Sequence, residues 1–276
     1  MQNTNKIEFS VSMCVYGGDS PNNFREAVES ILNQTLLPKE IVLVVDGPVP
    51  KELDVIIKSY EDIPIFSVIR LEKNQGHGNA RRIGLRACRY ELVALMDADD
   101  ISVVDRFEKQ IHVFELDRTL SVVGGIIYEF IDSVDNVIGK RVVPETDVEI
   151  KQYMKKRCPM NQVTVMLKKA DVDEVGGYID WYCEEDYYLW LRLCLANKSF
   201  YNIQENLVNV RVGYSMYQRR GGWKYFKSEA KLQQFMRKKG MIGFITFFVN
   251  VLERLIVQIL LPNRIRGWVF QKFARS

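Results

Sequence analysis

The chain has 276 residues, of which 47% are hydrophobic and 26% charged, a composition typical of a soluble globular protein with one large core. Its five cysteines are scattered and form no CxxC pair, which argues against a disulfide framework and a zinc site and indicates a reducing cytoplasm. The N-terminal residues lack an apolar signal region, and no segment is long and apolar enough to predict a transmembrane helix.

Charge is unevenly distributed along the chain. From Arg211 to the C-terminus there are 14 lysines and arginines against 2 acids, whereas the preceding 210 residues carry 24 against 33. An acidic body with a basic tail predicts an anionic partner for the tail: a membrane, a nucleic acid or a phosphorylated substrate.

The first hundred residues alternate between strand and helix patterns. The expected strands are 9–16, 41–45, 65–71 and 92–96, and the expected helices are 21–34, 51–60 and 77–88. This order predicts an α/β fold with a mainly parallel, doubly wound sheet. Beyond a helix at 103–116 we expect an antiparallel pair (121–131 and 137–143), a short helix (147–156), a strand (162–167) and a helix (185–196).

Three carboxylates follow the strand at 92–96. Asp97, Asp99 and Asp100 are expected at its C-terminal end, where open α/β sheets bind their ligands. Because crowded carboxylates repel one another, they favour a cation, and a hard divalent metal that bridges a diphosphate fits them. The alternative is an acidic loop that caps the helix starting near Ser102.

Glycine-containing loops follow two other strands. Tyr16-Gly17-Gly18-Asp19 lets the backbone approach a ligand, and Asp46 of Asp46-Gly47-Pro48 is placed to accept a hydrogen bond from a base or a ribose. Both loops are equally compatible with plain turns.

A longer segment, residues 74–82, spans a loop and the first turns of the helix expected at 77–88. It places two glycines before a helix N-terminus and follows them with arginines, which suits an anionic or nucleotide ligand. The pattern is neither a Walker loop nor a GxGxxG fingerprint, so it does not identify the ligand by itself.

A second acidic group, Glu184-Glu185-Asp186, begins the helix at 185–196 among aromatic residues. Acids at a helix start satisfy the helix dipole, which is a sufficient structural explanation. The functional alternative is that the rings exclude water and stack on a sugar, while a carboxylate among them has its pKa raised into the general-base range.

In this order the segments resemble family 2 glycosyltransferases with a GT-A fold, and they are most similar to the bacterial exopolysaccharide and capsule branch that includes the amylovoran galactosyltransferases. The matching segments are 10–16, 29–35, 41–48, 74–85, 97–100 and 185–190. The resemblance implies a GT-A catalytic domain over 1–212, with a nucleotide-binding half of about 1–100 and an acceptor half of about 101–212. Residues 213–276 would form a basic loop and an amphipathic helical tail.

The resemblance also implies roles for individual residues. Those expected to bind the nucleotide-sugar are Tyr16, Asp46, Asn74, Gly76, Arg81, Asp97 and Ala98. Asp99 would bind Mn²⁺ or Mg²⁺ on the diphosphate, and Asp186 would be the general base, supported by Glu185. One departure concerns the first loop, where Cys14 and Gly17 stand at positions that commonly hold a proline and an asparagine.

The implied activity is the inverting transfer of a hexose, galactose first, from a UDP-sugar to a polyprenyl-diphosphate-linked glycan, forming a β linkage. Two alternatives remain open: a metal-dependent nucleotidyltransferase, and a non-catalytic membrane-bound scaffold that keeps the fold.

The basic tail contains two further candidates. Arg219 and Arg220 stand beside two glycines and could close over a donor diphosphate or an acceptor pyrophosphate, or form a solvated turn. Residues 241–261 are apolar, with a polar stripe at helical spacing formed by Thr246, Asn250, Arg254 and Gln258. This pattern predicts an amphipathic helix in an anionic membrane interface. The polyprenyl-diphosphate-linked acceptor that the resemblance implies places this interface at the inner face of the cell membrane, and we expect no nucleic-acid partner. The alternative is a helix that packs on the catalytic domain or across a homodimer.

Overall fold

A computed structural model gives the architecture of the chain and describes residues 7–213 and 221–261. The strands are β1 (Phe9–Tyr16), β2 (Glu40–Asp46), β3 (Phe66–Arg70), β4 (Leu92–Asp97), β5 (Ile101–Ser102), β6 (Leu120–Phe130), β7 (Val137–Arg141), β8 (Met166–Lys168) and β9 (Ser199–Arg211). The helices are α1 (Pro21–Leu32), α2 (Lys51–Glu61), α3 (His77–Ala87), α4 (Arg106–Leu116), α5 (Asp147–Tyr153), α6 (Lys169–Glu174), α7 (Glu185–Leu195), α9 (Trp223–Lys238) and α10 (Phe244–Leu255). A 3₁₀ turn, η1 (Gln162–Thr164), and a π-helical turn, η2 (Ile256–Leu260), complete the described elements.

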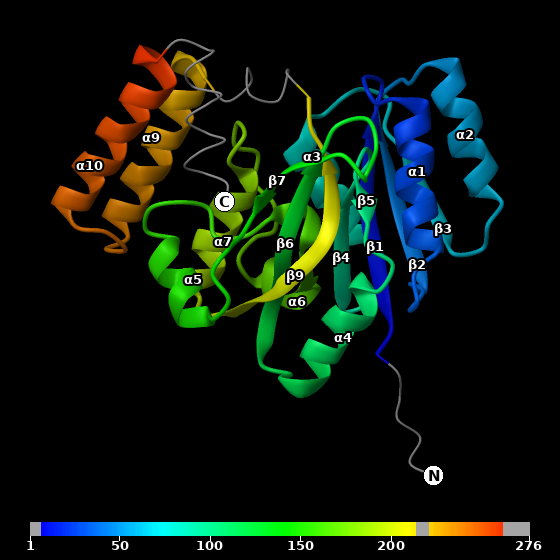
Figure 1. Ribbon diagram of the computed structural model, residues 1–276, viewed down its shortest axis with the longest axis horizontal. Helices are drawn as coiled ribbons and strands as arrows, with labels where there is room; N and C mark the ends of the chain where they lie inside the picture. The colour runs from blue at the N-terminus through cyan, green and yellow to red at the C-terminus, as the bar shows by residue number, and fades with distance from the viewer. Residues whose placement is uncertain (1–6, 214–220, 262–276) are drawn as a thin grey trace.

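These strands form one sheet in the order β3-β2-β1-β4-β8-β6-β9-β5, with β7 paired to β6 (Figure 1). The four strands β3, β2, β1 and β4 are parallel, β8 runs antiparallel to both of its neighbours, and β6 and β9 are parallel. The predicted α/β class with a mainly parallel sheet is therefore confirmed, as is the antiparallel pair β6–β7.

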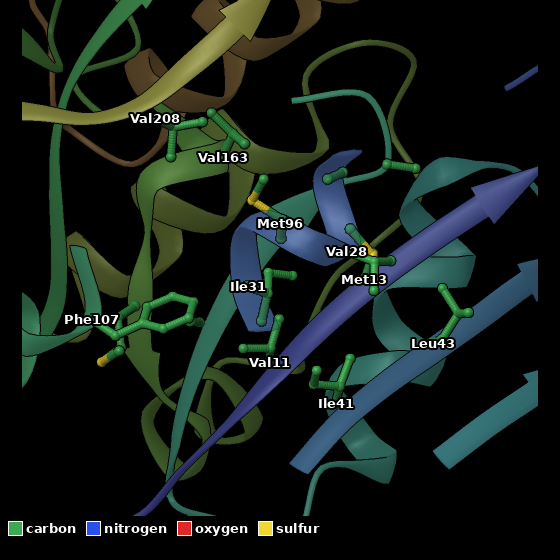
Figure 2. Close-up of a cluster of buried hydrophobic side chains, with 14 of the residues drawn as sticks. Val11, Met13, Val28, Ile31, Ile41, Leu43, Met96, Phe107, Val163 and Val208 are labelled. Atoms are coloured by element: carbon green, nitrogen blue, oxygen red, sulfur yellow. The ribbon is translucent and has the colours of Figure 1, made fainter. Parts of the chain in front are cut away.

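Helices cover both faces of the sheet, so its central strands are buried on both sides. On one face, α1, α2 and α4 pack over alternate residues of β1, β2 and β4. Figure 2 shows Val28 and Ile31 of α1 lying against Val11 and Met13 of β1. On the other face, the intervening strand residues, such as Val93, belong to a second buried cluster that includes residues of α3, α5, α7 and α9.

Several segments differ from the sequence-based prediction. The strand expected at 162–167 is instead the turn η1 followed by the three-residue strand β8. The helix expected from residue 103 begins at Arg106, because Ile101 and Ser102 pair with β9. Strand β9 itself was not predicted. Polar residues interrupt its apolar pattern, and its long pairing with β6 is a non-local interaction with register shifts near Gly125.

The C-terminal part of the described chain is a pair of helices, α9 and α10, at one end of the sheet (Figure 1). Helix α10 buries its polar stripe. Asn250 donates to Lys155 O (2.9 Å) and to Gln233 Oε1 (2.8 Å), and Arg254 Nε lies 2.7 Å from Glu229 Oε2. Apart from Glu253, the exposed side chains of α10 and η2 are apolar: Phe244, Ile245, Phe248, Val249, Leu252, Ile256 and Leu260.

The expected amphipathic helix is thus present, and its polar side is the one that packs on the protein. None of the helices in the described ranges has the length and mean hydropathy needed to cross a membrane.

Candidate functional site

Parallel pairing brings the ends of three strands together at one edge of the sheet. The register places Cys14 of β1 beside Asp97 of β4, and Tyr16 of β1 beside Asp46 of β2. The loops that follow β1, β2 and β4 therefore lie side by side, as predicted for a ligand site in an open α/β sheet.

Asp46 organises the loop before α3. Its carboxylate accepts hydrogen bonds from the N–H groups of Gln75 (2.7 Å) and Gly76 (3.1 Å), while the Asn74 side chain donates to Asp46 O (3.2 Å). Gly47 has a φ of +88°, and a Cβ at this position would lie 2.5 Å from Asn74 N, so a glycine is required here. Asp46, Asn74 and Gly76 are thus brought together, and the contact of Asp46 with a base stays a prediction.

Arg81 of α3 joins the two acidic segments of the site. Its Nη2 donates to Asp97 Oδ1 at 2.6 Å, and its Nη1 lies 3.5 Å from Glu185 Oε1 at the start of α7. His77 Nδ1 lies 3.7 Å from the same Glu185 oxygen. Arg81 is only 8% exposed, so its charge acts at low dielectric on both carboxylates. An arginine suits this geometry because its two Nη groups each face a different carboxylate.

The two partners of Arg81 have pKa values shifted in opposite directions. Burial raises the pKa of Asp97, but the charges of Arg81 and His77 outweigh it and leave the pKa below its usual value. For Glu185, burial and the neighbouring Asp186 raise the pKa to about 7, against the opposing effect of Arg81. A carboxylate that stays ionised and one that titrates near neutrality therefore lie on either side of one guanidinium.

The three acids after β4 have different surroundings. Asp97 pairs with Arg81, and the buried Asp100 accepts from Arg211 N at 2.9 Å, which fixes the end of β9. Asp99 is exposed between them. Burial, followed by the charges of Asp99 and Asp97, raises the pKa of Asp100 well above its usual value.

Asp19 is a site residue that the sequence analysis did not select. Its carboxylate accepts from Tyr16 N at 2.9 Å. Burial, followed by the charges of Asp99 and Asp97, raises its pKa to about 6, although the bond from Tyr16 lowers it. The feature of the sequence that could have identified Asp19 is its position at the end of the Tyr16–Asp19 loop.

The acidic residues around Asp99 fit a divalent cation that is held jointly by the protein and by a bound phosphate-containing ligand. The described residues contain no group of three or more metal-ligating side chains that could hold a metal ion by itself. The charge of the exposed Asp99 nevertheless adds to burial in raising the pKa values of Asp19 and Asp100. A cation bound by one carboxylate and by phosphate oxygens suits such a site, because Mg²⁺ is commonly held in this way.

Asp186 occupies the first turn of α7, next to Glu185. Its Oδ1 accepts from Tyr187 N at 2.7 Å, and Cys158 Sγ lies 4.0 Å from its Oδ2. Asp186 is half-buried, while Leu189 and Trp190 of the same helix are fully buried and fix its orientation.

The remaining predicted residues divide between exposed, buried and undescribed positions. Tyr16 is 47% exposed at the mouth of the first loop, and Ala98 is buried behind the acids. Arg219 and Arg220 lie outside the described residues.

Comparisons with protein families and with individual proteins point to the same family. Residues 10–178 match the family model "Glycosyl transferase family 2". The chain is 35% identical over 269 residues to the UDP-Gal:alpha-D-GlcNAc-diphosphoundecaprenol beta-1,3-galactosyltransferase of Escherichia coli, covering 97% of both chains. It is 34% identical over 264 residues to the amylovoran biosynthesis glycosyltransferase AmsE of Erwinia amylovora, covering 96% of this chain and 98% of that one.

Among solved structures, the mannosyltransferase PcManGT of Pyrobaculum calidifontis, in complex with GDP-Man and Mn²⁺, superposes with a TM-score of 0.62 at 14% identity. The match covers 95% of this chain and 72% of that one, and it supports the fold alone.

Replacing Arg81 with methionine removes the guanidinium shared by Asp97 and Glu185. We expect the free energy of unfolding to fall by about 3 kcal/mol at neutral pH, because a partly buried charge pair loses one member. The difference in free energy of unfolding between the variant and the unmodified protein should become smaller at acidic pH. The stabilisation from the lowered pKa of Asp97 is present above the pKa of the unfolded carboxyl and is lost as pH falls through the folded value. Urea denaturation at several pH values measures both effects.

Two variants serve as controls for this prediction. Arg81→Lys should give an intermediate loss, since one ammonium replaces the two Nη groups that each face a carboxylate. Arg86→Met, at an exposed position of the same helix, should change stability by no more than about 0.5 kcal/mol. Equal losses at Arg81 and Arg86 would show that the bridge does not stabilise the site.

Proposed function

The chain belongs to glycosyl transferase family 2, and from this membership we propose that it transfers a hexose, galactose first, from a UDP-sugar to a hydroxyl of a polyprenyl-diphosphate-linked glycan. The observation that carries the proposal is the Arg81 bridge, which joins the carboxylate after β4 to the acids of α7 in one site. The E. coli relative, matched over nearly its whole length, is named for this donor and this class of acceptor.

The donor nucleotide occupies the edge formed by the loops after β1, β2 and β4. The proposed nucleotide-sugar contacts are Tyr16, Asp46, Asn74, Gly76, Arg81, Asp97 and Ala98. Support comes from the hydrogen bonds that order residues 74–76 on Asp46, and from the buried positive charge of Arg81 beside this loop. Arg219 and Arg220, outside the described residues, are proposed to close over a diphosphate.

Asp99 is proposed to hold Mn²⁺ or Mg²⁺ together with the donor diphosphate. When bound, the cation would neutralise the charge that develops on the leaving nucleoside diphosphate. The support is that Asp99 acts electrostatically on two neighbouring carboxyl groups: after burial, its charge is the largest charge that raises the pKa values of Asp19 and Asp100.

Asp186 is proposed as the general base. The acceptor hydroxyl attacks the anomeric carbon opposite the diphosphate, and its proton passes to the Asp186 carboxylate. The bond between that carbon and the diphosphate oxygen breaks, and UDP leaves with the electron pair. A single displacement inverts the configuration, so an α-linked donor gives a β-linked product. Glu185, whose pKa is about 7, supports Asp186 from the adjacent position.

Helix α10 and the basic residues after it are proposed to hold the enzyme on the cytoplasmic face of an anionic membrane. The support is the orientation of α10: its polar stripe faces the protein, and seven apolar side chains of α10 and η2 are exposed. An interfacial helix with an apolar face and nearby cationic residues binds anionic bilayers in this way.

A transfer assay tests the activity. Purified protein is incubated with UDP-galactose, UDP-glucose or UDP-N-acetylglucosamine and a GlcNAc-diphosphate-lipid acceptor, with Mn²⁺ or with a chelator. We expect one donor to give a product whose new linkage is β by NMR, and we expect the chelator to suppress the reaction. Absence of both transfer and UDP binding with every donor would refute the glycosyltransferase proposal, and full activity in chelator would refute the metal role.

The Asp186→Asn variant tests the base. We expect the turnover number to fall by at least about a hundredfold, because positioned bases contribute about 10²–10⁴ to the rate. The dissociation constant for UDP should change little, since Asp186 has no proposed donor contact. Asp173→Asn, at an exposed position on α6, is the matched control. Activity of Asp186→Asn above a few per cent of the unmodified enzyme would remove Asp186 from this role.

The Phe248→Glu/Leu252→Glu double variant tests the membrane face. We expect its partitioning onto vesicles that contain phosphatidylglycerol to fall by at least about tenfold, because two apolar side chains are replaced by anions. Val55→Glu/Val148→Glu adds the same charge at exposed positions elsewhere and should bind normally. Unchanged vesicle binding would refute the proposal. Conversion of a dimer into a monomer by the first variant alone would assign the face to a second copy of the chain.

A further inference from the structure

A pocket of about 280 Å³ lies outside the cluster of site residues described above. One wall is the loop before α7, with Asp180, Trp181 and Tyr182, and the other is α9, with three lysines, Lys224, Lys227 and Lys231. The proposed function assigns no role to these residues.

The three lysines share one face of α9, since they are spaced by three and four residues. Lys224 Nζ lies 3.9 Å from the centre of the Tyr182 ring, and Lys231 Nζ lies 4.6 Å from that of Trp181. The aromatic rings thereby hold two ammonium groups at the pocket wall. Within the described residues, none of the three lysines forms a salt bridge with an acid.

The pocket walls are tied to each other. Trp181 Nε1 donates to Ser228 O at 3.3 Å, and Ser228 Oγ donates to Tyr182 O at 2.6 Å. Trp181 also packs on Tyr188 of α7, with ring centres 4.5 Å apart. The charged groups are therefore displayed on a fixed frame, which reduces the entropy lost when a ligand binds.

The pocket adjoins the proposed catalytic residues. Three residues separate Tyr182 from Asp186, and Glu184 N donates to Trp181 O at 3.2 Å. A Cβ placed on Gly78 of α3 would lie 3.5 Å from Asp180 Cα and 3.5 Å from Glu185 Cβ. Asp180 of the pocket wall and the aliphatic part of the Glu185 side chain therefore pack against the same glycine.

The exposed apolar face of α10 lies beyond α9. Helix α10 packs on the outer side of α9 (Figure 1), and Arg237 of α9 packs over Phe244 of α10, 4.9 Å from the ring centre. A site for anionic groups on α9 is thus flanked by a catalytic carboxylate on one side and by an apolar surface on the other.

We propose that this lysine pocket binds the diphosphate of the lipid-linked acceptor, an inference that rests on the proposed function. The three lysines and Asp180 together carry a charge of +2, which complements the two negative charges of a diphosphate diester. With the diphosphate here, the sugar extends toward Asp186 and the lipid chain toward α10. A phospholipid headgroup presents similar phosphate chemistry, so the experiment separates the two sources.

The test compares two acceptors that share a sugar. One is N-acetylglucosamine α-linked through a diphosphate to an octyl chain, and the other is the octyl α-glycoside without the diphosphate. For Lys224→Gln/Lys231→Gln we expect the KM for the diphosphate acceptor to rise about tenfold or more, because charge-assisted hydrogen bonds are lost. We expect an unchanged KM for the octyl glycoside and for the UDP-sugar, a turnover number within about threefold, and unchanged binding to phosphatidylglycerol vesicles.

Lys238→Gln/Lys239→Gln removes the same charge at exposed positions at the end of α9 and should leave all of these quantities unchanged. An equal rise in KM for both acceptors, or no rise for either, would overturn the proposal. Weaker vesicle binding with an unchanged acceptor KM would overturn it in favour of a phospholipid site.

Direct binding separates this inference from the proposed activity. Calorimetric titration of the unmodified protein with the diphosphate probe needs no turnover. If no donor supports transfer but the probe binds, and Lys224→Gln/Lys231→Gln abolishes the binding, the activity is refuted and the pocket assignment stands. If transfer occurs and the variant binds the probe normally, the pocket assignment alone is refuted.

Discussion

The arrangement of the site depends on the placement of one guanidinium between two carboxylates that are distant in sequence. Arg81 contacts Asp97, which ends a central strand, and Glu185, which begins a helix of the second half of the chain. Each carboxylate would repel the other without this cation, and Asp186 beside Glu185 adds to the repulsion. Burial of Arg81 strengthens both attractions, so the nucleotide edge and the proposed base are held in one site.

The pairing of Arg81 with Asp97 also explains why the acids of the site have different pKa values. Asp97 keeps a lowered pKa because Arg81 is its direct partner, whereas Asp19 and Asp100 have raised pKa values because burial and neighbouring acids dominate. The exposed Asp99 contributes to both of these raised pKa values. This is the distribution expected where a cation arrives together with an anionic ligand.

The C-terminal helices extend the site toward an apolar surface. Helix α10 is reversed relative to an ordinary surface helix, since its polar stripe binds α9 and the end of α5 while its apolar side is exposed. Helix α9 presents its lysines toward the loop before α7 on its other side. The sugar, the diphosphate and the lipid of the acceptor would therefore lie on three neighbouring surfaces: the acids of α7, the lysines of α9 and the apolar side of α10.

Local patterns in the sequence determined much of the fold and of the site. The buried runs of β1, β2 and β4 and the intervening helices predicted the parallel half of the sheet, because residues buried on both faces are apolar throughout. The same order placed Asp46 and Asp97 at one edge, where the structure has them. The polar stripe of residues 241–261 predicted the amphipathic helix α10.

Only the tertiary structure decided how these parts meet. Four features depend on contacts between residues that are distant in sequence. They are the pairing of β9 with β6, the bridge from Arg81 to Glu185 across 104 positions, the interaction of Asp19 with Asp99 and the choice of the side of α10 that faces the protein. Periodicity and composition indicate whether a residue prefers the solvent or the core. The choice of partner depends on the summed packing and electrostatic energy of the whole fold, which no short segment contains.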